Sequence, residues 1–123
     1  MPTHQTVACF VELVEAGQAI DALARFYAEN ASMRENQSPP RIGKPALLAY
    51  ETAAQASVSG MTAQCMRPIL IEGDTVVLRW IFDYVDSQGR AVHFEELAYQ
   101  RWAGDRILEE QFFYDPAQFN SRA

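Results

Sequence analysis

The chain has 123 residues, of which 49% are hydrophobic and 21% charged, and its formal net charge is -6. This length predicts a single domain over residues 1–123, and the composition is that of a folded globular protein. The acidic balance, without any run of lysine or arginine, argues against nucleic acid as a partner.

Metal and membrane association are also not expected. Cys9 and Cys65 stand apart without a CxxC pair, and the chain has only two histidines, so no metal site is predicted. The first residues are polar, and no apolar run approaches the roughly 18 residues that a membrane helix requires. We therefore expect a cytoplasmic protein without a membrane segment.

The first half of the chain has the spacing of helices. Apolar residues recur at i, i+3, i+4 and i+7 over 7–14 and again over 20–27, and Gly17 separates the two stripes. An extended piece over 31–36 precedes Ser38-Pro39-Pro40, which excludes a helix. Pro45 then marks the first turn of a third helix, which ends near 57–60.

The second half changes to the alternation of strands. Runs rich in β-branched and aromatic residues cover 61–72, 75–86, 90–102 and 106–114, with a short turn between each pair. Helices followed by a meander predict an α+β fold, with three helices packed on one face of a curved, mostly antiparallel sheet.

The strand over 75–86 has one face that suits the core. Its larger aromatic set is expected to face the helices, and comprises Val76, Leu78, Trp80, Phe82 and Tyr84. Pairing through the Gly73-Asp74 turn places Arg67 on the same face, among apolar groups, where it would need an acidic partner.

The next turn decides which acidic residue faces inward. A type I turn with a glycine bulge pairs Asp86 with Arg90, and places Phe94 beside Phe82 and Glu96 beside Trp80. A loop longer by one residue would instead turn His93, Glu95 and Tyr99 inward. Either pairing sets a carboxyl group against aromatic rings, where desolvation raises its pKa and suits it to acid or base chemistry. An ion pair with Arg67 is the alternative role for Glu96.

Three further polar residues are candidates, each with a simpler explanation. Asp115 ends the last strand but also precedes Pro116, as a turn residue does. His93 fits a surface position as well as a catalytic one, and Asn36 fits an Asx turn before the Pro-Pro loop.

Two segments carry a family resemblance: Met33-Arg34-Glu35-Asn36 with Pro39-Pro40-Arg41-Ile42-Gly43-Lys44, and the closing stretch from Gly104 to Asp115. With the order of elements, they resemble the SnoaL-like branch of the nuclear transport factor 2-like superfamily over essentially the whole chain. The resemblance implies a cone with an apolar pocket and a homodimer through the outer sheet face. The superfamily includes ketosteroid isomerases, polyketide cyclases, limonene-epoxide hydrolases, dehydratases and non-enzymatic binding domains.

The resemblance also suggests roles for individual residues. Asp115 matches the catalytic aspartate that closes the last strand in the cyclases, and Asn36 resembles a pocket asparagine of the hydrolases. The hydrolases' second aspartate falls at or beside His93, and their water-positioning tyrosine falls near Arg34, so their set is incomplete here.

The resulting hypothesis is an enzyme without an organic cofactor that acts by acid/base chemistry on a small apolar substrate. Asp115 would transfer the proton with Glu96 or His93 as partner, so Asp115→Asn should abolish turnover. Asn36 would orient an oxygen, and an apolar wall would be formed by Trp80, Phe82, Phe94 and Phe113. The alternative is a non-catalytic ligand-binding or dimerisation module of the same fold.

Overall fold

Helices form where the apolar stripes predict them. α1 (His4–Glu15) begins after Thr3, whose hydroxyl accepts a hydrogen bond from the backbone N–H of Thr6, and α2 (Ala19–Phe26) follows a short turn. α3 (Lys44–Ala56) begins after Gly43, with Pro45 in its first turn. The computed structural model describes residues 1–120.

Within residues 1–120, six strands form one sheet. Their bounds are β1 (Tyr27–Glu35), β2 (Arg41–Ile42), β3 (Ser59–Glu72), β4 (Thr75–Val85), β5 (Ala91–Ala103) and β6 (Arg106–Phe113), and a short 3₁₀ helix, η1 (Pro116–Asn120), follows. The strand order is β2-β1-β6-β5-β4-β3, and every neighbouring pair is antiparallel except β1 with β6. The predicted four-strand meander is therefore confirmed, and β1 joins it as a parallel neighbour of the last strand.

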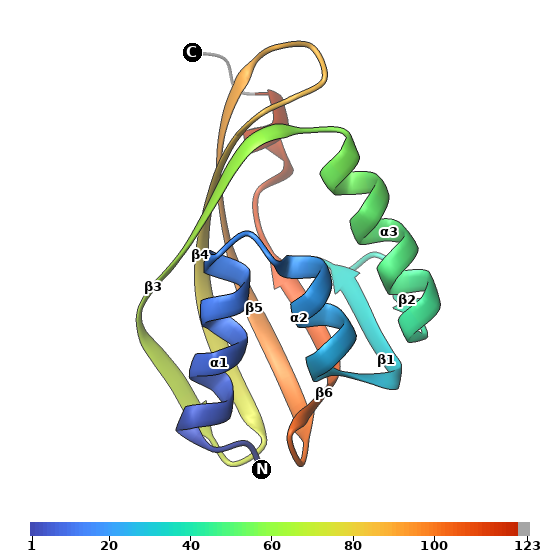
Figure 1. Ribbon diagram of the computed structural model, residues 1–123, viewed down its shortest axis with the longest axis vertical. Coiled ribbons are helices and arrows are strands. Elements are labelled where there is room, and N and C mark those ends of the chain that lie inside the picture. The colour runs from blue at the N-terminus through green and yellow to red at the C-terminus, as the bar shows by residue number, and fades with distance from the viewer. Residues whose placement is uncertain (121–123) are drawn as a thin grey trace.

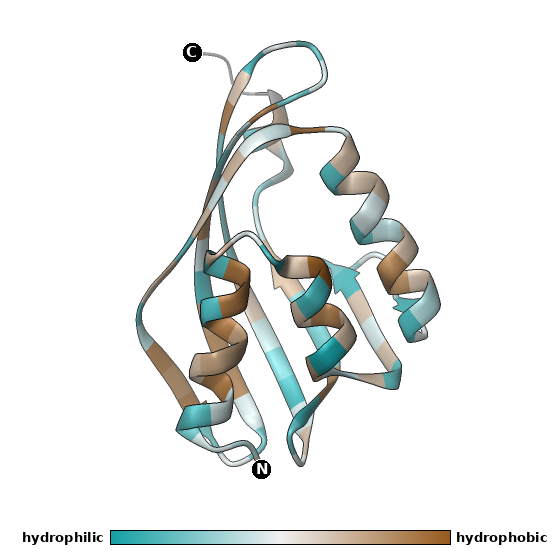
Figure 2. Ribbon diagram, viewed as in Figure 1, coloured by the Kyte–Doolittle hydropathy of each residue, from teal (hydrophilic) through white to brown (hydrophobic). Residues whose placement is uncertain are grey.

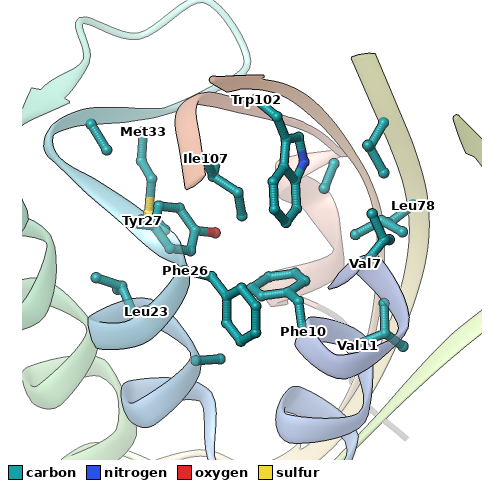
Figure 3. Packing of buried hydrophobic residues seen from close by; sticks show 14 of the residues in the cluster. Val7, Phe10, Val11, Leu23, Phe26, Tyr27, Met33, Leu78, Trp102 and Ile107 are labelled. Atoms are coloured by element: carbon teal, nitrogen blue, oxygen red, sulfur yellow. The ribbon is translucent and has the colours of Figure 1, made fainter. Parts of the chain in front are cut away.

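The three helices cover one face of this sheet (Figure 1), which confirms the predicted α+β architecture. Hydrophobic and hydrophilic residues alternate along the helices (Figure 2), and the buried ones include Val7, Phe10 and Val11 of α1 and Leu23 and Phe26 of α2. Figure 3 shows Phe10 of α1 and Phe26 of α2 close to Trp102 of β5, and the ring centroids of Phe10 and Trp102 lie 6.3 Å apart. The core therefore forms between the helix layer and the inner face of the sheet.

The register of β5 follows the predicted turn. Phe94 lies opposite Phe82 and Glu96 lies opposite Trp80, while Val76, Leu78 and Trp80 of β4 are buried. The favoured pairing is thus confirmed, and Glu96 is on the helix-facing side of the sheet.

The last strand departs from simple alternation. Arg101 pairs with Glu109 but Trp102 pairs with Ile107, so Leu108 is an extra residue on β6. This bulge exchanges the faces of the strand beyond it, because side chains alternate with a period of two. Phe113 is 39% exposed on the outer face, whereas Glu110 on the inner face is 3% exposed. The prediction that Phe113 faces inward is therefore wrong.

Arg67 also lies elsewhere than expected. The register of β3 with β4 shifts between Met66 and Leu70, so the segment that holds Arg67 leaves the regular ladder. The Arg67 side chain is 58% exposed, donates a hydrogen bond to the Cys65 carbonyl at 2.7 Å, and lies 3.8 Å from the carboxylate of Glu15. It has the expected acidic partner, but that partner is neither Glu96 nor a residue of the sheet.

Within residues 1–120, no helix is long and apolar enough to cross a membrane.

Candidate functional site

A cavity of about 340 Å³ lies between the helices and the sheet. Gly17 in the α1–α2 connection and Ala19 at the start of α2 border it, as do residues 58–61, where the chain enters β3. Its volume is at the lower end of the range of small-molecule pockets. The aromatic residues that line it are Phe10, Tyr27, Trp80, Phe82 and Phe112.

Glu96 projects into this cavity from the middle of β5. Burial raises its pKa well above 4.5, and the carboxyl groups of Glu110, Glu35 and Glu51 raise it further. Among the described residues, no hydrogen bond or cation lowers this pKa. Glu96 is therefore a weaker acid than an ordinary glutamate, and its side chain is free to meet a ligand.

Glu110 of β6 lies at the cavity floor and is held by two donors. The Tyr27 hydroxyl donates to one carboxylate oxygen, and Gln100 Nε2 donates to the other at 2.7 Å. Burial raises the pKa of Glu110 to about 7, against the lowering effect of these hydrogen bonds. Sequence reasoning missed Glu110 because the β6 bulge hid its direction. A signal was available, since the set that contains Glu110 also holds Leu108, Phe112 and Tyr114 and is the more apolar of the two.

Glu51 is the third carboxyl group of the cavity and comes from α3. Burial raises its pKa, while a hydrogen bond from Gln55 at 3.2 Å and the charge of Arg41 lower it. The α3 stripe predicted the helix but gave no reason to single out this residue, because a glutamate on a helix is usually exposed.

Two stacked aromatic rings form the wall of the cavity next to Glu96. The rings of Trp80 and Phe82 stack with centroids 5.8 Å apart, and both line the cavity. Phe94 is not in the lining. It packs behind the wall, 6.4 Å from Phe82 and 4.9 Å from Tyr114. The lining position predicted for Phe113 is occupied by Phe112.

His93 is on the opposite face of the sheet from the cavity. Its Nδ1 lies 2.7 Å from Asp83 and its Nε2 lies 2.9 Å from Glu95, and the hydrogen bonds to these two carboxylates raise its pKa. Its side chain is 56% exposed. The structure does not bring His93 and Glu96 together, because residues three positions apart along a strand point to opposite faces.

Asp115 is exposed and lies outside the cavity lining. Its Oδ1 accepts a hydrogen bond from the backbone N–H of Ala117 at 2.9 Å, which caps the 3₁₀ helix that follows. This is the turn-residue interpretation that the sequence left open.

Asn36 has a structural role in the same region. Its backbone lies in the left-handed region, with φ of 49°, and its side-chain oxygen accepts a hydrogen bond from Tyr114 N at 3.1 Å. Its carbonyl also accepts a hydrogen bond from Gln111 Nε2 at 2.6 Å. Asn36 thus joins the end of β1 to the end of β6 and does not line the cavity.

Within residues 1–120, no group of three or more histidine, cysteine or acidic side chains is arranged to hold a metal ion. The cavity instead offers several carboxyl groups in different settings: Glu96 without a partner and Glu110 with two donors. Pairs of titratable groups in unlike environments are what acid/base chemistry requires.

The fold and its cavity define the class of α+β proteins in which a curved sheet and a helix layer surround a small-molecule-sized pocket. Residues 7–110 match the family described as SnoaL-like domain, and the chain belongs to that family. The family resemblance seen in the sequence is thereby confirmed.

Solved structures agree on the fold. A protein of Mesorhizobium loti described as a SnoaL-like polyketide cyclase superposes with a TM-score of 0.79 at 24% identity, covering 93% of this chain and 100% of the other. One so described from Jannaschia sp. CCS1 gives 0.81 at 14% identity, covering 96% and 88%. An epoxide hydrolase from M. tuberculosis, described as LEH-like, gives 0.72 at 14% identity, covering 90% and 80%. No curated protein sequence matches the chain significantly.

Proposed function

We propose that the cavity binds a small, largely apolar molecule and moves a proton on it without an organic cofactor, with Glu96 as the proton-transfer group. The observation that supports this most directly is the setting of Glu96. It is a carboxyl group among aromatic rings, with its pKa raised well above 4.5 by burial. Raising the pKa of a carboxyl group makes its carboxylate form a stronger base, which favours proton transfer.

The other two carboxyl groups would assist. Glu110, with a pKa of about 7, is half protonated near neutral pH, and its neighbour Tyr27 also lines the cavity. A protonated carboxyl group or a tyrosine hydroxyl can donate a hydrogen bond to an oxygen that gains negative charge. The proposed division of labour is Glu96 as acid or base and the Tyr27–Glu110 pair as the oxygen-stabilising group.

The proposal is tested with three probe classes: a β,γ-unsaturated cyclic ketone, an aryl β-diketone and a terpene epoxide. Exchange of α-hydrogen in D₂O, followed by NMR, reports proton abstraction from the ketones, and chromatography reports products. We expect turnover of at least one class by the native protein. Glu96→Gln should lose about 100-fold or more, since the amide cannot transfer the proton.

Glu95→Gln is the matched control, because Glu95 is the neighbouring residue on the outer face and is paired with Arg79 at 3.2 Å. It should leave turnover unchanged. Undiminished turnover in Glu96→Gln would overturn the assignment of Glu96. Binding of the probes without turnover of any class would favour the non-catalytic ligand-binding alternative.

The outer face of the sheet favours a second proposal, an interface between two copies of the chain. Three apolar side chains gather there on β5 and β6: Leu97 at 46%, Tyr99 at 49% and Phe113 at 39% exposure. Leu97 lies directly opposite Phe113. Contiguous exposed apolar side chains are typical of protein interfaces. This surface is compatible with either role of the cavity, because the two are on opposite faces of the sheet.

A further inference from the structure

The ionisable carboxyl groups of the cavity lining are not balanced by cationic side chains in the lining. Among the described residues, those that line it include four glutamates and no lysine, arginine or histidine. Glu15 is the one with a cation beside it, since Arg67 lies 3.8 Å away. The remaining three carboxyl groups, those of Glu51, Glu96 and Glu110, come from α3, β5 and β6 and converge on one volume.

Arg41 is a cation close enough to affect the cavity, but its guanidinium group already has two other partners. Arg41 of β2 pairs with Glu35, and its guanidinium group lies 3.6 Å from the centroid of the Tyr50 ring. Its charge lowers the pKa of Glu51, but Arg41 does not line the cavity. Within residues 1–120, Glu51, Glu96 and Glu110 therefore lack the salt bridge that buried acids ordinarily have.

The lining also provides aromatic faces. Trp80 lies opposite Glu96 in the β4–β5 ladder and stacks on Phe82. A cation within about 6 Å of such a ring is attracted by its π electrons, and tryptophan gives the strongest attraction. Carboxylates and aromatic rings around one enclosed volume are the two groups that hold an organic ammonium ion.

We propose that the ligand of this cavity is a small hydrophobic amine in its ammonium form, with the charged nitrogen between Glu96 and Trp80 and the apolar body against the remaining aromatic wall. The observation that points to a ligand is Glu96, which lines the cavity without a hydrogen-bond partner among residues 1–120. An anionic ligand would face three carboxyl groups and no donor cation. A neutral apolar ligand would leave Glu96 unpaired when ionised.

This inference names the substrate class of the proposed function and uses the same cavity. An ammonium ion beside Glu96 would hold that carboxyl group ionised, which is the form that a base requires. The contact between the ammonium ion and Glu96 would then both hold the amine in the cavity and keep Glu96 in its basic form. Binding would also release protons, because the free cavity holds protonated carboxyl groups that the cation makes more acidic.

Three probes of one shape test the charge: cyclohexylmethylamine, cyclohexylmethanol and cyclohexanecarboxylate. Binding is followed by calorimetry and by the fluorescence of Trp80, which lines the cavity. At about pH 8 we expect the amine to bind about tenfold or more tightly than the alcohol, and the carboxylate not to bind. The amine's affinity should rise between about pH 6 and pH 8, as Glu110 with its pKa of about 7 ionises, while that of the alcohol stays flat.

Glu96→Gln should remove most of the preference for the amine over the alcohol, and Glu95→Gln on the outer face should retain it. Equal or tighter binding of the alcohol, or binding of the carboxylate, would overturn the proposal. The result is separable from that of the ketone and epoxide experiment. Amine binding without turnover of the ketones and the epoxide supports this inference and counts against proton transfer on those three probe classes. Turnover of one of them without a preference for the amine supports the proposed function and counts against this inference.

Discussion

The Gln100 amide and the Glu110 carboxylate meet in the floor of the cavity, with 2.7 Å between Gln100 Nε2 and Glu110 Oε2. A second hydrogen bond sets the orientation of the Gln100 amide, because Trp102 Nε1 donates to the Gln100 side-chain oxygen at 3.0 Å. The Gln100 amide therefore presents its N–H₂ group to Glu110. Both carboxylate oxygens of Glu110 act as acceptors, one from Gln100 and one from Tyr27.

Removing one of these donors should make Glu110 a weaker acid. The Tyr27 hydroxyl lowers the pKa of Glu110, so Tyr27→Phe is expected to raise that pKa above its present value of about 7. A ¹³C NMR titration of the glutamate side-chain carboxyl groups measures the change. Tyr99→Phe, on the outer face, is the control and should leave the titration as it is. An unchanged Glu110 titration in Tyr27→Phe would show that the hydroxyl does not stabilise the carboxylate.

The buried Glu110 should also make stability depend on pH. Its pKa in the folded protein is about 7, against 4.5 for the ordinary group, so the folded state keeps a proton that the unfolded state loses. The free energy of unfolding should therefore fall as pH rises from about 4.5 to about 7, by on the order of 3 kcal/mol from this group. Above that range both states are ionised and the loss is complete.

Denaturant unfolding of Glu110→Gln over the same pH range provides the measurement. The amide keeps the shape of the side chain but cannot ionise, so the free energy of unfolding should depend less on pH than in the native protein. Glu109→Gln, at an exposed neighbouring position paired with Arg101, is the control. Parallel curves for Glu110→Gln and the native protein would contradict the buried-acid explanation.

The helices and the β4–β5 hairpin could be predicted because local signals determine them. Apolar spacing predicted α1, and the turn after Asp86 set the pairing that places Glu96 opposite Trp80. The Asp86 carboxylate accepts hydrogen bonds from Gln88 N and Arg90 N, each at 2.9 Å, which stabilises that turn. A register fixed by a turn can be derived from a few adjacent residues.

The rest of the site depends on irregularities in strand pairing, whose positions no turn in the sequence marks. Leu108 is an extra residue on β6, because the pairing register with β5 shifts between Arg101 and Trp102. This shift places Glu110 and Phe112 on the face of the sheet that lines the cavity. Arg67 leaves the core face through a second register shift, in β3. Such irregularities arise from the fit between neighbouring strands, so they appear only when the whole sheet is assembled.

Asn36 should affect stability and leave ligand binding unchanged. Asn36→Gly keeps the left-handed backbone but loses the hydrogen bond to Tyr114 N, at a cost of about 1 kcal/mol. Asn36→Ala loses that bond and also strains the backbone, so it should cost roughly a further 1 kcal/mol. Thermal unfolding measures both variants. Loss of probe binding in a stably folded Asn36→Gly would restore Asn36 to the binding site.

Asp115 is the residue for which the family resemblance and the geometry predict different roles: the resemblance predicts a catalytic aspartate, and the geometry predicts a helix cap. Its side chain caps η1 outside the cavity, and an asparagine oxygen can accept the same hydrogen bond from Ala117 N. Asp115→Asn is therefore expected to retain full turnover of the probe that the native protein accepts, with unfolding temperature within about 2 °C of the native value. A loss of about 100-fold or more, with the fold intact, would return the catalytic role to Asp115.

The outer sheet face supplies the last prediction. If Leu97 and Phe113 form the centre of an interface between two copies, a charge there should separate them, because a desolvated arginine without a partner is unfavourable. Leu97→Arg should sediment as a monomer at concentrations where the native protein sediments as a dimer. Ile42→Arg, on the edge strand β2 and 67% exposed in the native chain, should leave the dimer intact. A native protein that is monomeric at every concentration, or a dimer unaffected by Leu97→Arg, would exclude this face as the interface. The amine and ketone probes should bind the monomeric Leu97→Arg variant as they bind the native protein, because the cavity is on the opposite face of the sheet.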